Sequence, residues 1–410
     1  MRFSKLALVA SLFIGCSGLS HGKAPTSKHK APRVQKVSAQ ADGLAEARLI
    51  DIYRQIANAN NRKALRKVES LVADYPYFQL AQLVYGDLLS TLARPIQEVG
   101  DAPLDLALAG AQNLQALRAE SRLRIAAIKE RPPVDAIPSQ FVSLSKRNKH
   151  AIAVDTTKAR LYLFENSNTG PRLLADYYIS VGKAGVGKNI EGDQRTPLGV
   201  YFITSNLDPK SLKDLYGSGA LPVNYPNVLD IRRGKTGGGI WLHGTPSKQF
   251  SRAPQATDGC VAVANPDLDR IIRTVEIRTT PVLIGKNFRW VRPANLVGER
   301  QTFANTLQTW AKAKQSGKEG ELLKYYANDF AADGKDLTQF SQVLRAELAK
   351  LRERSIQLSD VSLIRWADEA EVMVATFGEV AEGEKSGRTV RQYWQLRNNA
   401  WKIIFEGVVS

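Results

Sequence analysis

Two hydrophobic periods alternate along the chain and divide it into three segments. From about residue 44 to residue 131, apolar residues recur every three or four positions, as Leu65, Val68 and Leu71 do, which is the period of an amphipathic helix. Prolines interrupt this pattern, ending with the pair Pro132-Pro133, and they mark where helices end. The pattern therefore predicts an α-helical domain over residues 44–132.

Near residue 144 the spacing of apolar residues changes from the helical period to alternation. Short apolar runs follow, separated by Gly, Pro and Asn. Such runs are typical of strands in a mainly-β domain, which we expect over residues 144–290. One helix interrupts them, with Asn265 at its N-cap and Pro266 at its first position. The predicted strands are 151–154, 161–164, 173–181, 199–204, 240–243, 260–264 and 280–284.

In the third segment, apolar residues recur with a helical period after Leu296, and apolar and polar residues alternate towards the C-terminus. The alternation predicts three strands, at 372–380, 389–396 and 401–408. Asn398 and Asn399 separate the last two strands, and asparagine tolerates the positive φ of a tight hairpin turn. We therefore expect an α+β, cone-shaped domain over residues 297–410. Three of its aromatic residues either line a ligand pocket or form its core: Tyr393, Trp394 and Trp401.

The N-terminus predicts export. Arg2 and Lys5 precede an apolar run over residues 6–15, which is the arrangement of a secretory signal and is too short for a comfortable membrane span. We assign the signal peptide to residues 1–22. Residues 23–43 are basic and rich in Ala, Pro and Ser, so they are expected to form a flexible linker.

Two cleavage sites compete within this signal. One follows a small residue near Gly22, and the other precedes Cys16, because residues 12–16 resemble a lipoprotein signal. The first releases a soluble protein, and the second leaves a lipid anchor at Cys16. Both alternatives place the protein in the periplasm or cell envelope.

The amino-acid composition excludes several classes of protein and of ligand site. The 410 residues carry 57 Lys and Arg against 40 Asp and Glu, a net charge of +17, with two cysteines and four histidines. So few cysteines exclude a disulfide scaffold and a cysteine-rich zinc module. The positive charge suits an anionic partner, and the export signal argues against nucleic acid. The glycine run 237–239 lacks the Lys-Ser/Thr pair of a phosphate-binding loop.

One histidine and one cysteine stand in a context that favours catalysis. His243 ends the apolar run Ile240-Trp241-Leu242 and is followed by Gly244, and sixteen residues separate it from Cys260. A thiol becomes a nucleophile when an imidazole takes its proton. Gly259 lets a substrate approach the main chain, where N–H groups can stabilise an oxyanion. Either residue alone is more often structural, but the combination predicts a cysteine nucleophile.

These residues resemble the signature of the L,D-transpeptidase catalytic domain, a His-Gly pair followed by Ser/Thr-x-Gly-Cys. Here the two parts are His243-Gly244 and Thr257-Asp258-Gly259-Cys260. Upstream, residues 192–201 (GDQRTPLGVY) are similar to the second motif of the family, in which Thr-Pro-x-Gly precedes a core strand. The resemblance covers about residues 145–286 and implies an L,D-transpeptidase-type fold for the central domain.

The resemblance also implies a reaction. Cys260 would attack the bond between the third residue of a peptidoglycan stem peptide and its D-Ala, and would form an acyl-enzyme. His243 would act as base and then as acid, with its imidazole oriented by the Gly244 carbonyl. The N–H groups of Gly259 and Cys260 would hold the oxyanion, and no metal or organic cofactor is needed. The substrate-binding candidates are Thr257, Asp258, Arg195, Thr196 and Thr245.

Two positions depart from the family pattern. Asp258 stands where transpeptidases usually have His or Arg, and Ala262 stands where Arg or Asn is frequent. A related subgroup, the L,D-carboxypeptidases that determine cell shape, shares the Asp-Gly-Cys context and has a C-terminal domain of the nuclear-transport-factor-two-like (NTF2-like) type. Asp258 either orders a hydrolytic water or caps the turn before Cys260.

Three functions remain open at this stage. The first is an L,D-transpeptidase acting on tetrapeptide stems, and the second is an L,D-carboxypeptidase that trims them to tripeptides. The third is a catalytically silent adaptor that binds the cell wall. The helical domain, whose helix pairs resemble tetratricopeptide units, is a candidate for binding a protein partner, and the C-terminal domain is a candidate for homodimer formation.

Overall fold

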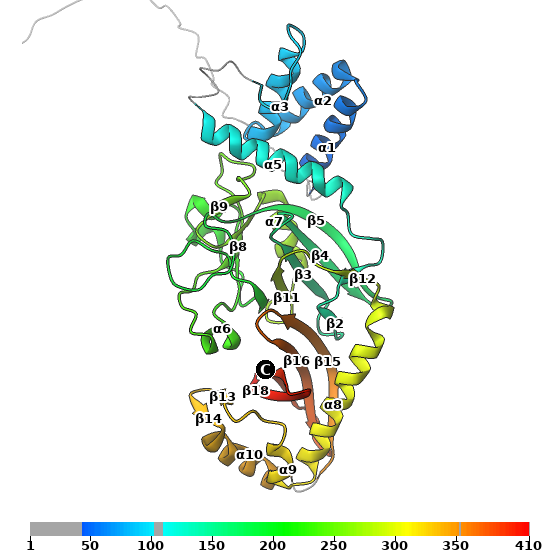
Figure 1. The fold of residues 1–410 in the computed structure, drawn as a ribbon, viewed down its shortest axis with the longest axis vertical. Helices are drawn as coiled ribbons and strands as arrows, with labels where there is room; N and C mark the ends of the chain where they lie inside the picture. Colours follow the sequence, from blue (N-terminus) through cyan, green and yellow to red (C-terminus); the bar gives the residue numbers. More distant parts are fainter. Residues whose placement is uncertain (1–42, 102–109, 352–353, 410) are drawn as a thin grey trace, which may run out of the picture. The chain divides into compact units, whose positions relative to one another are not determined.

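The computed structural model describes residues 43–101, 110–351 and 354–409. The predictions for the signal peptide and for Cys16 lie outside the described residues, as does the linker up to residue 42. Within the described residues, no helix combines the length and the apolar character that crossing a membrane requires. Figure 1 traces the order of the elements along the chain.

The helical period of the first segment corresponds to helices in the structure. Their apolar stripes meet in one core, in which Leu49, Val68, Leu71 and Val84 are almost fully buried, as amphipathic helices require. The helices are α1 (Leu44–Ala57), α2 (Asn61–Asp74), α3 (Gln79–Ser90) and α5 (Ala111–Lys129).

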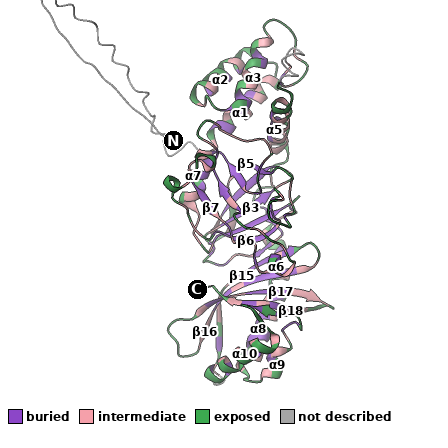
Figure 2. Cartoon of the chain, turned by 90° about the vertical axis from the view of Figure 1, so that its left-hand side faces the viewer, coloured by how far each residue is buried: buried purple, intermediate pink, exposed green. Residues whose placement is uncertain are grey.

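The central domain is built on a mixed sheet with strand order β6-β11-β3-β4-β5-β10-β8-β7. Its middle strands are apolar on both faces because each face has its own core: Ile152 and Val154 face one, and Ala151 and Ala153 face the other (Figure 2). The strands are β3 (His150–Asp155), β4 (Arg160–Ser167), β5 (Gly170–Gly182), β6 (Gly199–Phe202), β7 (Ala220–Pro222), β8 (Trp241–His243), β9 (Gln255–Thr257), β10 (Val261–Val263) and β11 (Pro281–Gly285).

Helix α7 (Asn265–Thr274) follows β10 directly and packs Leu268 and Ile271 into the first core of this sheet. Both predictions for its start are displaced by one residue, because Asn265 is the first helical position and Pro266 the second. The N-cap residue is Ala264, which makes no side-chain capping bond. The Asn265 side chain is used elsewhere, as described below for the candidate site.

The C-terminal domain packs helices against an antiparallel sheet of order β18-β17-β16-β15-β2. The hairpin prediction is confirmed, because Asn398 and Asn399 have φ values of 47° and 63°. Tyr393 and Trp394 are buried core residues, and half-buried Trp401 packs on Phe303 at 5.1 Å. The elements are α8 (Val297–Gln315), α9 (Glu319–Leu323), α10 (Leu337–Leu351), β15 (Ile356–Ala367), β16 (Glu371–Ala381), β17 (Arg388–Arg397) and β18 (Ala400–Val408).

Two strands of this sheet are absent from the sequence-based prediction. β15 escapes it because its register shifts between Ser359 and Ser362, around Asp360 with a φ of 50°, and such a bulge breaks the alternation. The other is β2 (Phe141–Ser143), which precedes the central domain in the chain yet pairs with β15. The C-terminal sheet therefore includes residues from outside the predicted 297–410.

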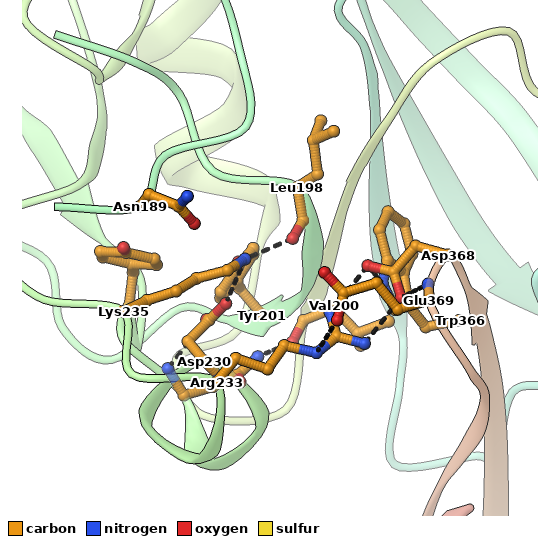
Figure 3. Close-up of polar contacts among 12 residues, drawn as sticks. Asn189, Leu198, Val200, Tyr201, Asp230, Arg233, Lys235, Trp366, Asp368 and Glu369 are labelled. Carbon is orange, nitrogen blue, oxygen red and sulfur yellow. Dashed lines mark hydrogen bonds and ion pairs between the residues drawn. The ribbon is translucent and has the colours of Figure 1, made fainter. Parts of the chain in front are cut away.

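The central and C-terminal domains share the second core of the central sheet, which contains Phe202 from β6 and Val374 from β16. Polar contacts add to this junction. Arg233, next to the short helix α6 (Val228–Arg232), donates to both carboxylate oxygens of Asp368 at 2.7 and 2.8 Å (Figure 3). Short strand pairs complete the fold, β1 (Ile137–Pro138) with β12 (Trp290–Val291) and β13 (Ala331–Ala332) with β14 (Lys335–Asp336).

Candidate active site

His243 ends β8, and Cys260 directly precedes β10, which pairs in parallel with β8. β8 pairs with β10 so that Leu242 lies opposite Val261, and His243 lies opposite Ala262. Leu242 and Val261 belong to the first core, and side chains alternate along a strand, so His243 and Ala262 lie on the other face. Cys260 directly precedes β10, and its Sγ lies 3.3 Å from the carbonyl oxygen of Gly239, two residues before β8. The structure thus brings Cys260 and His243 onto neighbouring segments of one sheet.

The His243 imidazole is buried, with 2 % of the residue exposed. Its Nδ1 lies 2.7 Å from the Gly244 carbonyl oxygen, a contact in which Nδ1–H donates and the Nε2 lone pair stays available. The Tyr216 ring meets the imidazole edge-on, with centroids 5.2 Å apart. Burial lowers the pKa of His243 to about 4. The ring is therefore neutral at pH 7 and in the state that accepts a proton.

The Cys260 thiol is half-buried and free of any disulfide. Its Sγ donates to the Gly239 carbonyl oxygen at 3.3 Å, and the Trp241 backbone N–H is directed at the sulfur. Burial raises the pKa of the Cys260 thiol to about 11, so the thiol is protonated at pH 7. Because its proton faces Gly239, transfer to the imidazole requires a change in the Cys260 side-chain torsion.

The Arg252 charge acts on both groups, and the Lys188 charge lowers the pKa of the thiol alone. The positive charge of half-buried Arg252 opposes the rise in the pKa of Cys260 that burial causes, and it adds to the fall in the pKa of His243. Burial in turn lowers the pKa of Arg252. Lys183 forms an ion pair of 2.9 Å with the exposed Asp258 carboxylate, which also accepts from Gln194 at 3.3 Å. The Asp258 charge next to the thiol is therefore partly neutralised.

Asn265 holds the loop behind the imidazole. Its side-chain oxygen accepts from the backbone N–H groups of Ser218 and Thr245, both at 3.0 Å, and its amide donates to the Thr245 carbonyl at 2.9 Å. Gly244 lies inside this arrangement, since a Cβ there would come within 2.0 Å of the Asn265 oxygen. The side chain predicted to cap α7 instead fixes the backbone that orients His243.

The turn before Cys260 is closed by Thr257. Its hydroxyl donates to the Cys260 carbonyl at 2.7 Å and accepts from the Gly259 N–H at 3.2 Å. Gly259 has a φ of 122°, and a Cβ there would lie 2.8 Å from the Arg195 carbonyl oxygen, so only glycine fits. Thr257, and not Asp258, supplies the side-chain bonds of this turn. The Gly259 N–H, predicted to hold an oxyanion, is occupied by Thr257 in this structure.

The predicted substrate-binding residues divide into two groups. Thr257, Thr196 and Thr245 are buried, and their hydroxyls bond to backbone groups; Thr196 accepts from Gly182 N–H at 2.9 Å and Thr245 donates to the Phe250 carbonyl at 3.2 Å. These hydroxyls therefore hold the backbone around the site in place. Arg195 and Asp258 are exposed beside the Gly259 turn, where a substrate can reach them.

Sequence reasoning missed three residues that act on the site. Arg252 lies in a segment of no clear period, so no pattern signals its approach to Cys260. Lys183 follows a predicted strand and shows no motif. Asn265 was conspicuous in the sequence, but its position before Pro266 favours an N-cap, and only the fold shows that Thr245 lies within its reach.

The comparisons with known proteins give the families of two of the three domains. Residues 149–284 match the family model of the L,D-transpeptidase catalytic domain (YkuD), and residues 302–407 match the Cds6 C-terminal NTF2-like domain. The chain thus combines an L,D-transpeptidase-type catalytic domain with an NTF2-like domain. It carries N-terminal helices, a central YkuD domain and a C-terminal NTF2-like domain, which confirms the fold class and the resemblance inferred from the motifs.

Solved structures share the fold over most of the chain. Bd1075 from Bdellovibrio bacteriovorus is 24 % identical with a TM-score of 0.57, and the match covers 67 % of this chain and 98 % of Bd1075. The helical cell-shape-determining protein Pgp2 from Campylobacter jejuni is 24 % identical with a TM-score of 0.52, covering 65 % of this chain and 95 % of Pgp2. No match was found among curated proteins.

Proposed function

We propose that the chain is an exported, cysteine-dependent enzyme that cleaves the bond before the terminal D-Ala of peptidoglycan tetrapeptide stems. The observation that carries this proposal is that Cys260, directly before β10, and His243, at the end of the parallel neighbour β8, lie on adjacent segments of one sheet. The match of residues 149–284 to the L,D-transpeptidase catalytic domain supports the substrate class. The predicted signal peptide supports a location in the periplasm or cell envelope.

The proposed first half-reaction starts from the neutral pair. The thiol proton passes from Cys260 Sγ to His243 Nε2, while Nδ1–H keeps its bond to Gly244. The sulfur attacks the carbonyl carbon of the third stem residue and forms a C–S bond as the carbonyl oxygen takes the negative charge. The C–N bond to D-Ala then breaks, and the leaving amine takes the proton from the imidazolium. A thioester at Cys260 and free D-Ala result.

The Arg252 charge acts in opposite directions on the two charged groups that proton transfer would form. Transfer of a proton from a thiol with a pKa of about 11 to an imidazole with a pKa of about 4 separates charge within a partly buried site. The Arg252 charge stabilises the thiolate and disfavours the imidazolium, so it favours a state in which the proton has left the pair and the thiolate remains. We assign Arg252 this role next to the nucleophile.

The second half-reaction has two candidate acceptors. An amine from another stem yields a crosslink, and water yields a tripeptide stem. The pairing of the catalytic domain with an NTF2-like domain is the arrangement expected of the carboxypeptidase subgroup, and Pgp2, which shares the fold, is a helical cell-shape-determining protein. These observations favour water as the acceptor, and hence a role in cell shape.

The test is incubation of the purified protein with tetrapeptide muropeptides, followed by mass spectrometry of the products. Loss of D-Ala alone identifies the carboxypeptidase, and crosslinked dimers identify the transpeptidase. Neither product forms with Cys260→Ala if the proposal is correct. A wild-type protein that leaves muropeptides unchanged, while still binding them, would indicate the wall-binding adaptor instead.

A further inference from the structure

A cavity lies between the central and the C-terminal domains, apart from the site just described. Its volume is about 540 Å³, within the range of small-molecule sites. One wall comes from the central domain, at residues 202–204 and 277–279, and the other from β15, β16 and β17 of the C-terminal sheet. None of the candidate active-site residues lines it. The cavity therefore belongs to the junction of two domains.

Arg391 from β17 is the central polar group of this cavity. Its guanidinium carbon lies 3.4 Å from the centroid of the Phe202 ring, which is stacking distance. Its Nε donates to the Thr376 hydroxyl at 3.0 Å. In the part of the chain that the structure describes, Arg391 forms no ion pair with a carboxylate. Burial lowers the pKa of Arg391 to about 10, so the structure around it does not compensate its charge.

The cavity carries an excess of positive charge. Arg278, exposed at the opposite wall, also forms no ion pair among the described residues. Arg147 pairs with Asp360 at 3.2 Å and donates to the Thr389 hydroxyl. The lining thus contains three arginines and one carboxylate, and the carboxylate is already used by Arg147.

The remaining lining residues indicate which groups, besides an anionic one, the cavity can accommodate. Phe202, Ile203, Ile277 and Phe377 give the cavity an apolar part. Phe202 is held in place, because its backbone N–H donates to the Asn224 side chain at 2.6 Å. A guanidinium stacked on a fixed ring keeps its outer N–H groups in one plane, ready for a two-oxygen anionic group.

We propose that this cavity binds a small organic anion, with a carboxylate or phosphate group held by Arg391 and Arg278 and an apolar body lying against Phe202 and Phe377. The bound anion supplies the counter-charge that the described residues do not give Arg391. Because the two walls belong to different domains, such a ligand also strengthens their association. This proposal is independent of the chemistry at Cys260.

The test is calorimetric titration of the full protein with benzoate and with phenyl phosphate, which carry the two anionic groups on the same apolar ring. We expect at least one to bind with one site per chain, and benzyl alcohol, which has no charge, not to bind. Binding of benzoate alone identifies a carboxylate ligand, and binding of phenyl phosphate alone identifies a phosphate ligand. Arg391→Gln should weaken the binding at least tenfold.

The matched control is Arg62→Gln, which makes the same change of charge on the exposed surface of α2 and should leave binding unchanged. Arg278→Gln gives a second test at an exposed position, should Arg391→Gln lower expression. The proposal is wrong if neither anion binds the wild-type protein. It is equally wrong if the Arg391 and Arg278 variants bind as the wild type does, or if Arg62→Gln weakens binding as much as they do.

Discussion

At the scale of single residues, the neutral thiol and imidazole are the feature with the most direct consequence. A half-buried cysteine with a pKa of about 11 and a histidine with a pKa of about 4 do not rest as a thiolate–imidazolium pair. Cysteine enzymes that rest as ion pairs react with alkylating agents even at low pH. Here the thiolate is expected to form only when substrate is in place or when the pH is high.

The rate at which iodoacetamide alkylates Cys260 should therefore be low at pH 7 and rise steadily to at least pH 10. The pKa of Cys260 is raised, so the thiolate fraction grows about tenfold per pH unit below that pKa. The measurement is intact-mass kinetics across this range, with Cys260→Ala as the blank for other nucleophiles. A rate that is already at its plateau at pH 6 would contradict the neutral pair.

Asp258 allows its two proposed roles to be separated. Its carboxylate is exposed and paired with Lys183, and an exposed pair contributes about 0–1 kcal/mol to stability. Asp258→His and Asp258→Asn should therefore leave the melting temperature nearly unchanged. If the carboxylate orders the hydrolytic water, both variants release less D-Ala by hydrolysis, and the histidine raises amine exchange.

Product ratios and melting curves from the same preparations decide between the roles of Asp258. Lys183→Met serves as the matched control, because it removes the partner and keeps the carboxylate. A fall in melting temperature together with an equal loss of both products would support the turn-capping role. Stability and product ratio that both stay at the wild-type values would show that Asp258 has neither role.

At the scale of elements, the start of α7 connects the strand after Cys260 to the loop after His243. The Asn265 side chain makes two bonds to Thr245 in that loop and a third to the Ser218 N–H, so Asn265→Ala leaves two N–H groups and one carbonyl without their partner. We expect a loss of about 1–3 kcal/mol in the free energy of unfolding. Turnover should fall at least tenfold, because Gly244 no longer holds the imidazole in one orientation.

A readout that is specific to positioning distinguishes this effect from simple destabilisation. Alkylation of Cys260 at pH 10 should be unchanged in Asn265→Ala, since the thiolate forms there without His243, whereas turnover at pH 7 should be low. The control is Thr274→Ala at the other end of the same helix, where the hydroxyl donates to the Arg270 carbonyl. Equal turnover in Asn265→Ala and Thr274→Ala would show that Asn265 does not position the imidazole.

Asp267 gives α7 a second, pH-dependent contact. It is buried, it accepts from the Gly43 N–H at 2.7 Å, and burial raises its pKa to about 7. Because this value lies above the unfolded value of 3.8, ionisation costs stability progressively from about pH 4 to pH 7. Asp267→Asn removes this cost and keeps the acceptor oxygen, so it should stabilise the protein more at pH 8 than at pH 5.

The expected difference between the two pH values is about 2.5 kcal/mol in the free energy of unfolding. Denaturant melts of the wild type, Asp267→Asn and the control Asp269→Asn on the same helix measure it. A gain for Asp267→Asn that is the same at pH 5 and pH 8 would mean that the carboxylate does not titrate in this interval.

At the scale of the whole molecule, the helical domain contacts the loop that leads to Cys260. Phe250 packs between Tyr75 and Phe78, with ring centroids at 5.3 and 4.4 Å, and Ser251 donates to buried Glu120 at 2.8 Å. Arg252 is the next residue and acts on the thiol. The N-terminal helices therefore fix the segment that carries the cation of the site.

Phe250→Ala should lower turnover without touching the catalytic pair. The ring loses its contacts with the helices, at a cost of about 1–3 kcal/mol in stability, and residues 245–256 become more mobile. Hydrogen exchange in this segment and the turnover rate on muropeptides measure both effects. Tyr77→Ala, at an exposed neighbouring position, is the control; equal losses in both variants would argue against a specific coupling.

Features that depend on neighbouring residues in the sequence could be predicted, whereas features that depend on contacts between distant segments could not. Local periods identified the helices and most strands, and the His243 and Cys260 motifs identified the catalytic domain. The Asp360 bulge broke the alternation that would have revealed β15. β2 joins a sheet more than 200 residues later in the chain, which no local pattern encodes. Arg252 and Asn265 depend on contacts between segments, so only the fold places them.

The central claim is that Cys260 forms the acyl-enzyme, and intact-mass analysis with a carbapenem tests it most directly. The account predicts a single covalent adduct on the wild-type protein, no adduct on Cys260→Ala, and a much slower adduct on a His243→Ala variant that keeps the thiol but lacks its base. An adduct that persists in Cys260→Ala, or a folded wild-type protein that forms none, would contradict the account.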